Sequence, residues 1–205
     1  MNSSTTKRMK WFGCIALACL LYPAASWTAP TNNKDFGWMT QYVGKSSSDL
    51  ASDTRFKPTL SAWLPTQPPL AHTNNTADAA QDFMAQGQGP IQISGTNLFA
   101  IGCLPQACGS AGGWLWVDTG PQHAIVLALL SVRPGPPSSV LPLTLVVVGQ
   151  KLTPQLDLSQ AAQQSLSAWL KKIKANNVVD CNIVNFEIET PAGKRKAELP
   201  SYLRM

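Results

Sequence analysis

Two cysteines stand five positions apart around a proline, as Cys103 and Cys108 in the run Cys-Leu-Pro-Gln-Ala-Cys. Enzymes of thiol–disulfide exchange place two residues between their cysteines, so the four residues found here disfavour redox catalysis. A structural zinc ion needs about four ligands, and only His123 lies near enough in sequence to join the pair. The spacing therefore favours a disulfide, with metal binding and free thiols as the alternatives, and we expect no cofactor.

Hydrolytic chemistry has few candidate residues in this sequence. His72 lies in a polar stretch and His123 precedes an apolar run, and neither belongs to a recognisable motif. Ser110 lacks the Gly-x-Ser-x-Gly context of a hydrolase nucleophile, and Asp118 is typical of a turn residue. His123 itself is typical of a hydrogen-bonded histidine at a strand end. We therefore expect a protein without catalytic residues, the alternative being a hydrolase that uses His123 and Ser110.

The first 26 residues have the features of a secretory signal peptide. Three basic residues precede an uncharged apolar run over residues 11–22, which is too short to span a bilayer comfortably. The segment Ala24-Ala25-Ser26 then offers small residues at the positions that a signal peptidase reads. We expect cleavage after Ser26 and export to the periplasm. Cleavage after Ala29, an uncleaved membrane anchor and a lipid-modified Cys19 are the alternatives.

Cleavage would change both the charge and the cysteine content of the chain. The 205 residues carry 16 Lys and Arg against 11 Asp and Glu, and the signal peptide holds three of the basic residues and none of the acidic ones. The mature chain therefore has 13 basic and 11 acidic residues, a net charge of +2. Cys14 and Cys19 are lost, so an oxidising compartment leaves Cys103 and Cys108 as the closest pair and Cys181 as a buried free thiol.

The small net charge argues against a nucleic-acid partner. No basic stripe with interleaved aromatic residues occurs, and the local cluster Lys194-Arg195-Lys196 is typical of a solvated turn. We expect contact with a membrane only through the signal peptide. The sequence leaves a homodimer open.

Helical patterns fill the first part of the mature chain, and strand patterns follow. Short helices are expected over residues 35–43, 46–53, 58–64 and 77–86. A β-hairpin is expected over residues 91–102, and further strands over residues 114–118, 123–130 and 141–148. The last two of these strands are apolar throughout and flank a proline-rich linker over residues 132–140.

The clearest helix is expected over residues 157–176. Asp157 with Gln160 resembles a capping box at its start. Five apolar residues fall on one face at helical spacing, namely Ala162, Leu166, Trp169, Leu170 and Ile173. This face predicts that the helix packs against a sheet.

A last strand is expected over residues 178–190. Its alternation shifts by one residue between Ile183 and Phe186, which predicts a bulge. Glu187 and Glu189 share one face and are expected to point to solvent, and the tail from residue 191 is polar and loosely determined. The elements together predict an α+β fold in which residues 27–205 form a single domain. Its mainly antiparallel sheet would be flanked by short N-terminal helices and one long helix in the second half.

The segment from about residue 91 to residue 131 resembles the inhibitor of vertebrate lysozyme (Ivy) family. That family carries a Cys-Lys-Pro-His-Asp-Cys-Gly-Ser-type loop between two strands, and this chain has Cys-Leu-Pro-Gln-Ala-Cys-Gly-Ser over residues 103–110. Both cysteines, Pro105, Gly109 and Ser110 match, and an aromatic strand and a Thr-Gly turn follow. Stretches within residues 42–57 are similar to the opening of exported relatives, so the resemblance covers roughly residues 40–131.

The resemblance implies that the loop binds a protein. In the lysozyme inhibitors the loop enters the active-site cleft of the enzyme, and its histidine meets the catalytic carboxylates. In this chain Gln106 replaces that histidine, Leu104 replaces the lysine and Ala107 replaces the aspartate. Gln106 can donate two N–H bonds to a carboxylate, but it carries no charge.

The expected function is therefore that of an exported, non-enzymatic Ivy-like protein. It would present Leu104, Pro105, Gln106 and Ala107 to a protein partner, which the resemblance identifies as a lysozyme or another peptidoglycan hydrolase. The alternative is a structural or assembly component of the cell envelope that uses the fold without inhibitory activity. A loop that merely straps two strands together, with nothing bound, would have the same sequence pattern.

Overall fold

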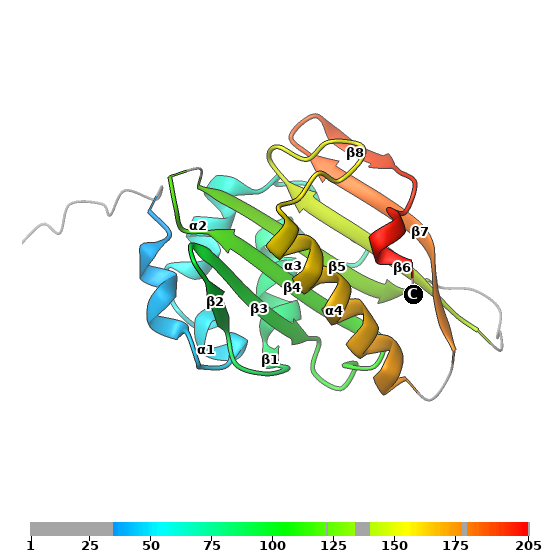
Figure 1. Ribbon diagram of the computed structural model, residues 1–205, viewed down its shortest axis with the longest axis horizontal. Coiled ribbons are helices and arrows are strands. Elements are labelled where there is room, and N and C mark those ends of the chain that lie inside the picture. Colours follow the sequence, from blue (N-terminus) through cyan, green and yellow to red (C-terminus); the bar gives the residue numbers. More distant parts are fainter. Residues whose placement is uncertain (1–34, 122, 134–139, 178–179, 205) are drawn as a thin grey trace, which may run out of the picture. The chain divides into compact units, whose positions relative to one another are not determined.

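The structure of the protein, a computed structural model, describes residues 35–121, 123–133, 140–177 and 180–204. The signal peptide expected over residues 1–26 and most of the expected linker at residues 132–140 lie outside this part of the chain. In this part of the chain, four short helical segments come before the first strand and one long helix comes before the last two strands. Figure 1 shows their arrangement. The α+β fold predicted from the sequence is confirmed.

The four short helical segments are a 3₁₀ helix η1 and three α-helices. Their bounds are η1 Gly37–Tyr42, α1 Ser47–Ala51, α2 Phe56–Trp63 and α3 Thr76–Met84. Each overlaps a helix predicted from the sequence. The start of α1 is fixed by a capping box, in which the Ser46 hydroxyl accepts from the backbone of the first turn and the Asp49 carboxylate accepts from the Ser46 backbone N–H at 3.1 Å. Pro58 lies in the first turn of α2, where its missing N–H costs nothing.

The described part of the chain forms one eight-stranded sheet in the order β1-β3-β4-β5-β6-β7-β8, with β2 also paired to β3. The bounds are β1 Gln86–Gly87, β2 Gln92–Ser94, β3 Asn97–Cys103, β4 Ala111–Asp118, β5 Ala124–Val132, β6 Leu141–Gly149, β7 Cys181–Thr190 and β8 Gly193–Lys196. All neighbours are antiparallel except β6 and β7, which are parallel because the chain between them crosses over through α4 (Gln160–Asn176). The sheet is therefore mainly antiparallel, as predicted.

The sheet is buried on both faces, which explains why its central strands are apolar throughout. The N-terminal helices cover one face and α4 covers the other (Figure 1). On β5, Ile125, Leu127 and Leu129 belong to the core under the N-terminal helices, whereas Val126, Ala128 and Leu130 belong to the core under α4. Successive side chains of a strand point to opposite faces, so a strand covered on both sides needs apolar residues at every position.

Helix α4 presents to the sheet the five apolar residues predicted from its periodicity, and all five are buried. Its start differs from the prediction. The Ser159 hydroxyl caps the helix by accepting from the Ala162 N–H at 3.3 Å, whereas the Asp157 carboxylate accepts from the Thr153 hydroxyl at 2.8 Å. The physical reason is a tight turn at Leu156, whose φ of 54° takes the chain out of the helical region before Ser159.

The C-terminal end of the chain corrects three predictions. Residues predicted as a polar tail form β8 and a short 3₁₀ helix η2 (Ser201–Leu203), and the basic cluster predicted as a solvated turn lies in β8. Glu189 was expected to face solvent but is fully buried, because Lys194 lies opposite it in β8 and bonds the carbonyls of Pro68 and Pro69 above it. The Lys194 Nζ lies 3.7 Å from the Glu189 carboxylate.

The bulge predicted in the last strand is confirmed. The register of β6 against β7 shifts after Leu143, which faces Ile183, so that Thr144 faces Asn185. Val184 is thereby left without a partner on β6, and it is 53% exposed. Extra residues of this kind bend a strand locally and end the regular alternation of its side chains.

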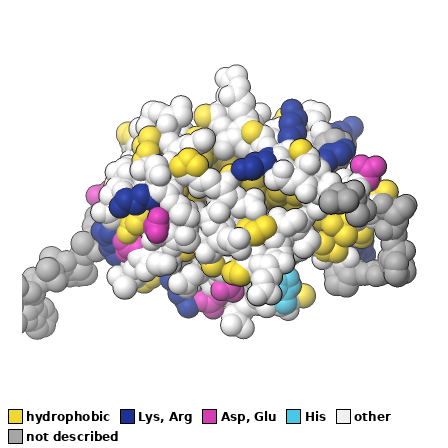
Figure 2. All heavy atoms as spheres, turned by 90° about the horizontal axis from the view of Figure 1, so that it is seen from below, with side chains coloured by type: hydrophobic (Ala, Val, Ile, Leu, Met, Phe, Trp, Pro, Cys, Tyr) yellow, Lys and Arg dark blue, Asp and Glu magenta, His cyan; other side chains and the backbone are white. Residues whose placement is uncertain are grey.

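The surface carries its charges in small groups. On the face drawn in Figure 2, several Lys and Arg side chains gather towards the upper right, and others on the left adjoin acidic side chains. None of the helices in the described part of the chain is both long enough and apolar enough to cross a membrane.

Candidate functional site

The cysteine loop connects β3 to β4 at one end of the sheet. Cys103 is the last residue of β3 and Ala111 the first of β4, and the two strands run antiparallel with Cys103 opposite Gly112. Cys103 and Cys108 form a disulfide, with their Cα atoms 4.9 Å apart. The pairing predicted from the sequence is confirmed, so neither cysteine is free to bind a metal or to act as a thiol.

The loop is also closed by its own backbone hydrogen bonds. The Ala107 N–H donates to the Leu104 carbonyl at 3.0 Å, and the Ala107 carbonyl accepts from Ser110 and Ala111 at 2.9 and 2.8 Å. Because these bonds and the disulfide constrain the same few residues, the loop has little freedom to change shape.

The four residues predicted to bind a partner divide into two pairs. Pro105 and Gln106 are exposed at the tip of the loop, whereas Leu104 and Ala107 are half-buried and pack against the core under the N-terminal helices. Gln106 has a φ of 65°, a left-handed conformation that is uncommon for a residue other than glycine or asparagine. Leu104 and Ala107 therefore anchor the loop, and Pro105 and Gln106 form the part that another molecule can reach.

The base of the loop is held from both layers of the fold. Gln88, which follows β1, donates from its side-chain Nε2 to the Cys103 sulfur at 3.3 Å. The backbone carbonyl of Gln88 accepts from the Lys172 amine of α4 at 2.9 Å. At Gly102 a Cβ atom would lie 2.6 Å from the carbonyl oxygen of Phe83 in α3, so only glycine fits there. The strand that carries the loop is thus packed directly against both a helix and an edge strand.

The side chains of the tip carry no charge. Leu104, Pro105, Gln106 and Ala107 contain a single polar side chain, the carboxamide of Gln106, which offers N–H donors and a carbonyl acceptor. The tip can therefore form neutral hydrogen bonds and apolar contacts, but no ion pair of its own.

The residues of the alternative hydrolase do not come together. Ser110 immediately precedes β4 and His123 follows its far end, and the eight residues of β4 span about 24 Å at about 3.4 Å per residue. The Ser110 hydroxyl donates to the Ala107 carbonyl at 3.3 Å, and His72 is exposed in the loop before α3. Ser110 and His123 are therefore too far apart to act together on one substrate.

His123 was predicted to be hydrogen-bonded, and the structure corrects this. Its Nδ1 atom is buried and has no hydrogen-bond partner among the described residues, and its ring lies edge-on to Phe36 with the centroids 5.7 Å apart. The backbone at His123 has a φ of 40°, which is again left-handed. The prediction failed because the strand begins one residue later, at Ala124, and leaves His123 in a turn.

Cys181 is buried and free, as predicted, and burial raises the pKa of its thiol. One polar cluster was missed by the sequence reasoning. The Tyr42 hydroxyl donates to Asp53 at 2.6 Å, and Arg55 binds the same carboxylate through Nε at 3.0 Å and through a terminal nitrogen at 2.7 Å.

The hydrogen bonds from Arg55 and Tyr42 hold the pKa of Asp53 well below its usual range. The Arg55 guanidinium also lies over the ring of Trp38, 4.4 Å from its centroid. Because Tyr42 ends η1 and Arg55 is the residue directly before α2, the cluster ties these helices together. An acidic and a basic residue two positions apart, Asp53 and Arg55, could have indicated this ion pair in the sequence. Nothing in the sequence indicates that Tyr42 joins them.

The fold and the loop together define a class of protein, an α+β domain that carries a disulfide-closed loop between two central strands. Residues 72–143 match the family model described as Inhibitor of vertebrate lysozyme (Ivy). The matched segment includes α3, the strands β1 to β5 and the whole disulfide loop, so the resemblance seen in the sequence is confirmed for this part of the chain. Comparisons with curated proteins and with solved structures gave no match.

Proposed function

We propose that this protein is exported and binds a lysozyme-type peptidoglycan hydrolase through the tip of its disulfide loop. The observation that carries the proposal is the exposure of Pro105 and Gln106 on a loop that a disulfide closes, within the segment that matches the lysozyme-inhibitor family. The protein would act by occupying the cleft of the hydrolase and would itself catalyse nothing.

The rigidity of the loop supports binding. A segment that is ordered before it meets its partner loses little conformational entropy on docking. Three kinds of interaction already order the loop in the free protein. They are the disulfide, the backbone hydrogen bonds within the loop, and the contacts of Leu104 and Ala107 with the core. The contacts of Pro105 and Gln106 with a partner would therefore increase the affinity directly, because little of their free energy would be needed to order the loop.

The chemistry of the tip also fits such a partner. Retaining and inverting glycoside hydrolases hold two carboxyl groups on either side of the bond they cleave, and these groups are strong hydrogen-bond acceptors. Gln106 would donate an N–H bond to one of them. A neutral donor is weaker than a charged one by about a factor of two in bond strength, so we expect weaker binding than a histidine or lysine at residue 106 would give.

A titration of the purified protein into c-type lysozymes and other peptidoglycan hydrolases tests the proposal. Inhibition of cell-wall lysis and direct binding by calorimetry would be measured in parallel. Gln106→Ala should weaken both, and Gln155→Ala serves as the matched control because Gln155 is also exposed but lies outside the loop. If no hydrolase is bound or inhibited at micromolar protein, the proposal is wrong.

The same protein preparation tests the other parts of the proposal. Export predicts that the mature protein recovered from the periplasm begins at Trp27, which N-terminal sequencing would show. Capture of a stable envelope complex, without binding to any hydrolase, would instead support the role of an envelope assembly component. Sedimentation at several concentrations would show whether the protein forms a homodimer.

A further inference from the structure

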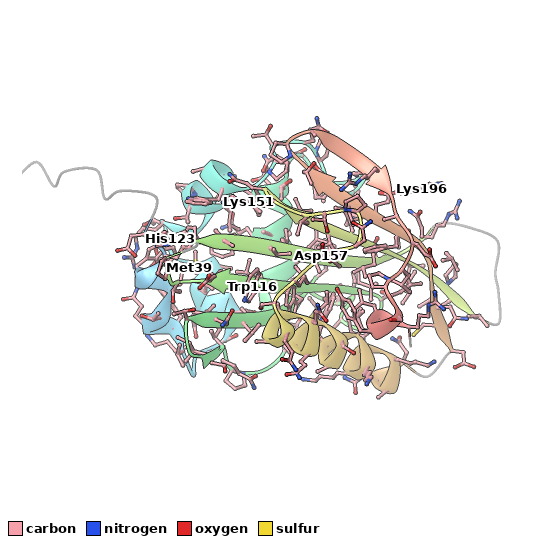
Figure 3. The ribbon with its side chains drawn as sticks, turned by 45° about the horizontal axis from the view of Figure 1, so that its top comes forward. Met39, Trp116, His123, Lys151, Asp157 and Lys196 are labelled. Atoms are coloured by element: carbon pink, nitrogen blue, oxygen red, sulfur yellow. A yellow bond between two sulfur atoms is a disulfide. The ribbon has the colours of Figure 1, made fainter. Side chains whose placement is uncertain are left out.

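A half-open cavity of about 850 Å³ lies at the end of the sheet where β4 leads into β5. Asn97, Trp116 and Asp118 line it from β3 and β4, on the face of the sheet that α4 covers. Asp157, from the segment that leads into α4, also lines it, as do Trp63, His123 and Lys151. Figure 3 labels Trp116, His123, Lys151 and Asp157, with His123 at the beginning of β5.

The polar side chains of the cavity are held in place by their neighbours. The side-chain Oδ1 of Asn97 accepts from the Trp116 indole N–H at 2.9 Å. The Oδ1 of Asp118 accepts from the backbone N–H of Gly120, also at 2.9 Å. Asp157 accepts from the Thr153 hydroxyl at 2.8 Å. Each carboxylate has more acceptor sites than these single bonds use, so both can accept further bonds from a ligand.

His123 is the group whose state points most directly to a ligand. Its Nδ1 atom is buried without a hydrogen-bond partner among the described residues, and the residue lines the cavity from a left-handed backbone conformation. Buried polar atoms nearly always have a partner, and exceptions call for a water or a bound molecule. Strained backbone of this kind also concentrates at binding sites.

The composition of the cavity selects a class of ligand. Two carboxylates, Asp118 and Asp157, and one lysine, Lys151, line the cavity, so acidic groups are in slight excess and an anionic ligand is disfavoured. The lining offers acceptors at Asp118 and Asp157 together with the indole side chains of Trp63 and of Trp116, which is 8% exposed. A sugar ring matches this set, because its hydroxyls donate and accept hydrogen bonds while its C–H face is apolar.

We propose that this cavity binds a neutral saccharide of one or two rings. The volume lies within the range of about 300–1,000 Å³ that is usual for small-molecule sites. The hydroxyls would donate to Asp118 and Asp157, His123 Nδ1 would complete its hydrogen bonding with the ligand, and an indole face would lie against the ring. The site is separate from the disulfide loop, because the length of β4 lies between them.

Calorimetry and the indole N–H signals in NMR spectra test this proposal, with glucose, N-acetylglucosamine, cellobiose and chitobiose as probes. We expect at least one of them to bind at millimolar concentration or below and to shift the Trp116 signal. Asp118→Asn keeps the acceptor for Gly120 but removes the charge, and it should weaken binding about tenfold. Asp180→Asn is the control, because Asp180 is exposed and lies outside the cavity.

Several outcomes would overturn the proposal. These are no response to any neutral sugar, binding of only the charged analogues glucosamine or glucuronate, or equal affinities of the wild type and of a stably folded Asp118→Asn protein. Gln106→Ala should bind the sugar as the wild type does. A loss of sugar binding in that variant would place the site at the loop and contradict the assignment.

Discussion

The two ends of β4 carry surfaces of opposite kinds. At one end the disulfide loop projects Pro105 and Gln106 without any charged group, and at the other a cavity brings together two carboxylates, an imidazole and two indoles. The loop owes its shape to a covalent bond between residues close in sequence. The cavity is assembled from segments far apart in the chain, so its shape depends on the packing of the whole domain.

This difference has a functional consequence. A rigid projection suits the cleft of another protein, whereas a concave site of mixed polarity suits a small molecule. Variants can therefore separate the two ends, because damage to the loop should leave the cavity intact. Damage to the shared core should affect both.

The largest effect is expected from Trp114→Ala, which should weaken both ends of β4 together. Trp114 is fully buried in the middle of β4, and its indole donates to the Ser165 hydroxyl of α4 at 3.0 Å. Loss of such a side chain leaves a cavity and costs about 3–5 kcal/mol of unfolding free energy. Denaturant unfolding would measure the change, and a cost below about 1 kcal/mol would show that β4 is not the common support.

Removal of the disulfide should have a smaller effect on stability but a decisive one on the loop. The variant Cys103→Ala/Cys108→Ala is expected to lose about 2 kcal/mol, since the closed loop is short. Any binding to a hydrolase should be lost, whereas sugar binding should persist in the fraction that remains folded. Equal hydrolase binding with and without the disulfide would contradict the role given to rigidity.

A change of pH should alter the stability of the fold through a third region, the paired strands β7 and β8. Burial raises the pKa of Glu189 above its ordinary value of 4.5, and the carboxylate of Glu187 acts in the same direction. A folded-state pKa above the unfolded one means that this group stabilises the fold below about pH 4.5 and that the contribution is lost as the pH rises through the folded pKa.

The variant Glu189→Gln should remove this dependence. It is expected to unfold at the same or a higher denaturant concentration at neutral pH, with a flatter pH profile above pH 4.5. Glu198→Gln is the control, because the Glu198 side chain is 90% exposed. A steeper loss of stability on raising the pH in Glu189→Gln than in the wild type would show that the ion pair with Lys194 outweighs burial.

The smallest effect is expected at the start of α4. Ser159→Ala removes the hydroxyl that accepts from the Ala162 N–H and should cost about 1 kcal/mol of unfolding free energy. Gln160→Ala keeps the cap and removes an exposed side chain, so it should be nearly neutral. If Gln160→Ala costs more than Ser159→Ala, the capping box predicted from Asp157 and Gln160 describes the helix better.

The sequence allowed the sheet, the buried face of α4 and the disulfide to be predicted because each depends on local patterns. Periodicity identified Leu166 and Trp169 as core residues, and the spacing of Cys103 and Cys108 indicated their bond. The burial of Glu189 could not be foreseen, because it depends on a loop more than a hundred residues earlier and on a strand that has no apolar alternation.

The disulfide loop could be predicted from the sequence, but which of its residues are exposed and which pack against the core could not. The sequence places four residues in one turn and does not distinguish the buried ones from the exposed ones: Leu104, Pro105, Gln106 and Ala107. The structure separates them, because Leu104 and Ala107 pack against the core under the N-terminal helices whereas Pro105 and Gln106 are exposed. The cavity was missed for a related reason, since Asn97, Trp116 and Asp157 meet only after the sheet and α4 have formed.

The most direct test of the central claim is the affinity of the protein for c-type lysozymes and other peptidoglycan hydrolases, compared among the wild type, Gln106→Ala and Gln106→His. We predict measurable binding by the wild type and a loss of binding in Gln106→Ala. Gln106→His should bind more tightly below about pH 6.5, where the imidazole becomes charged. Identical affinities for all three proteins, or no binding by any of them, would contradict the claim that the tip of the disulfide loop is the binding site.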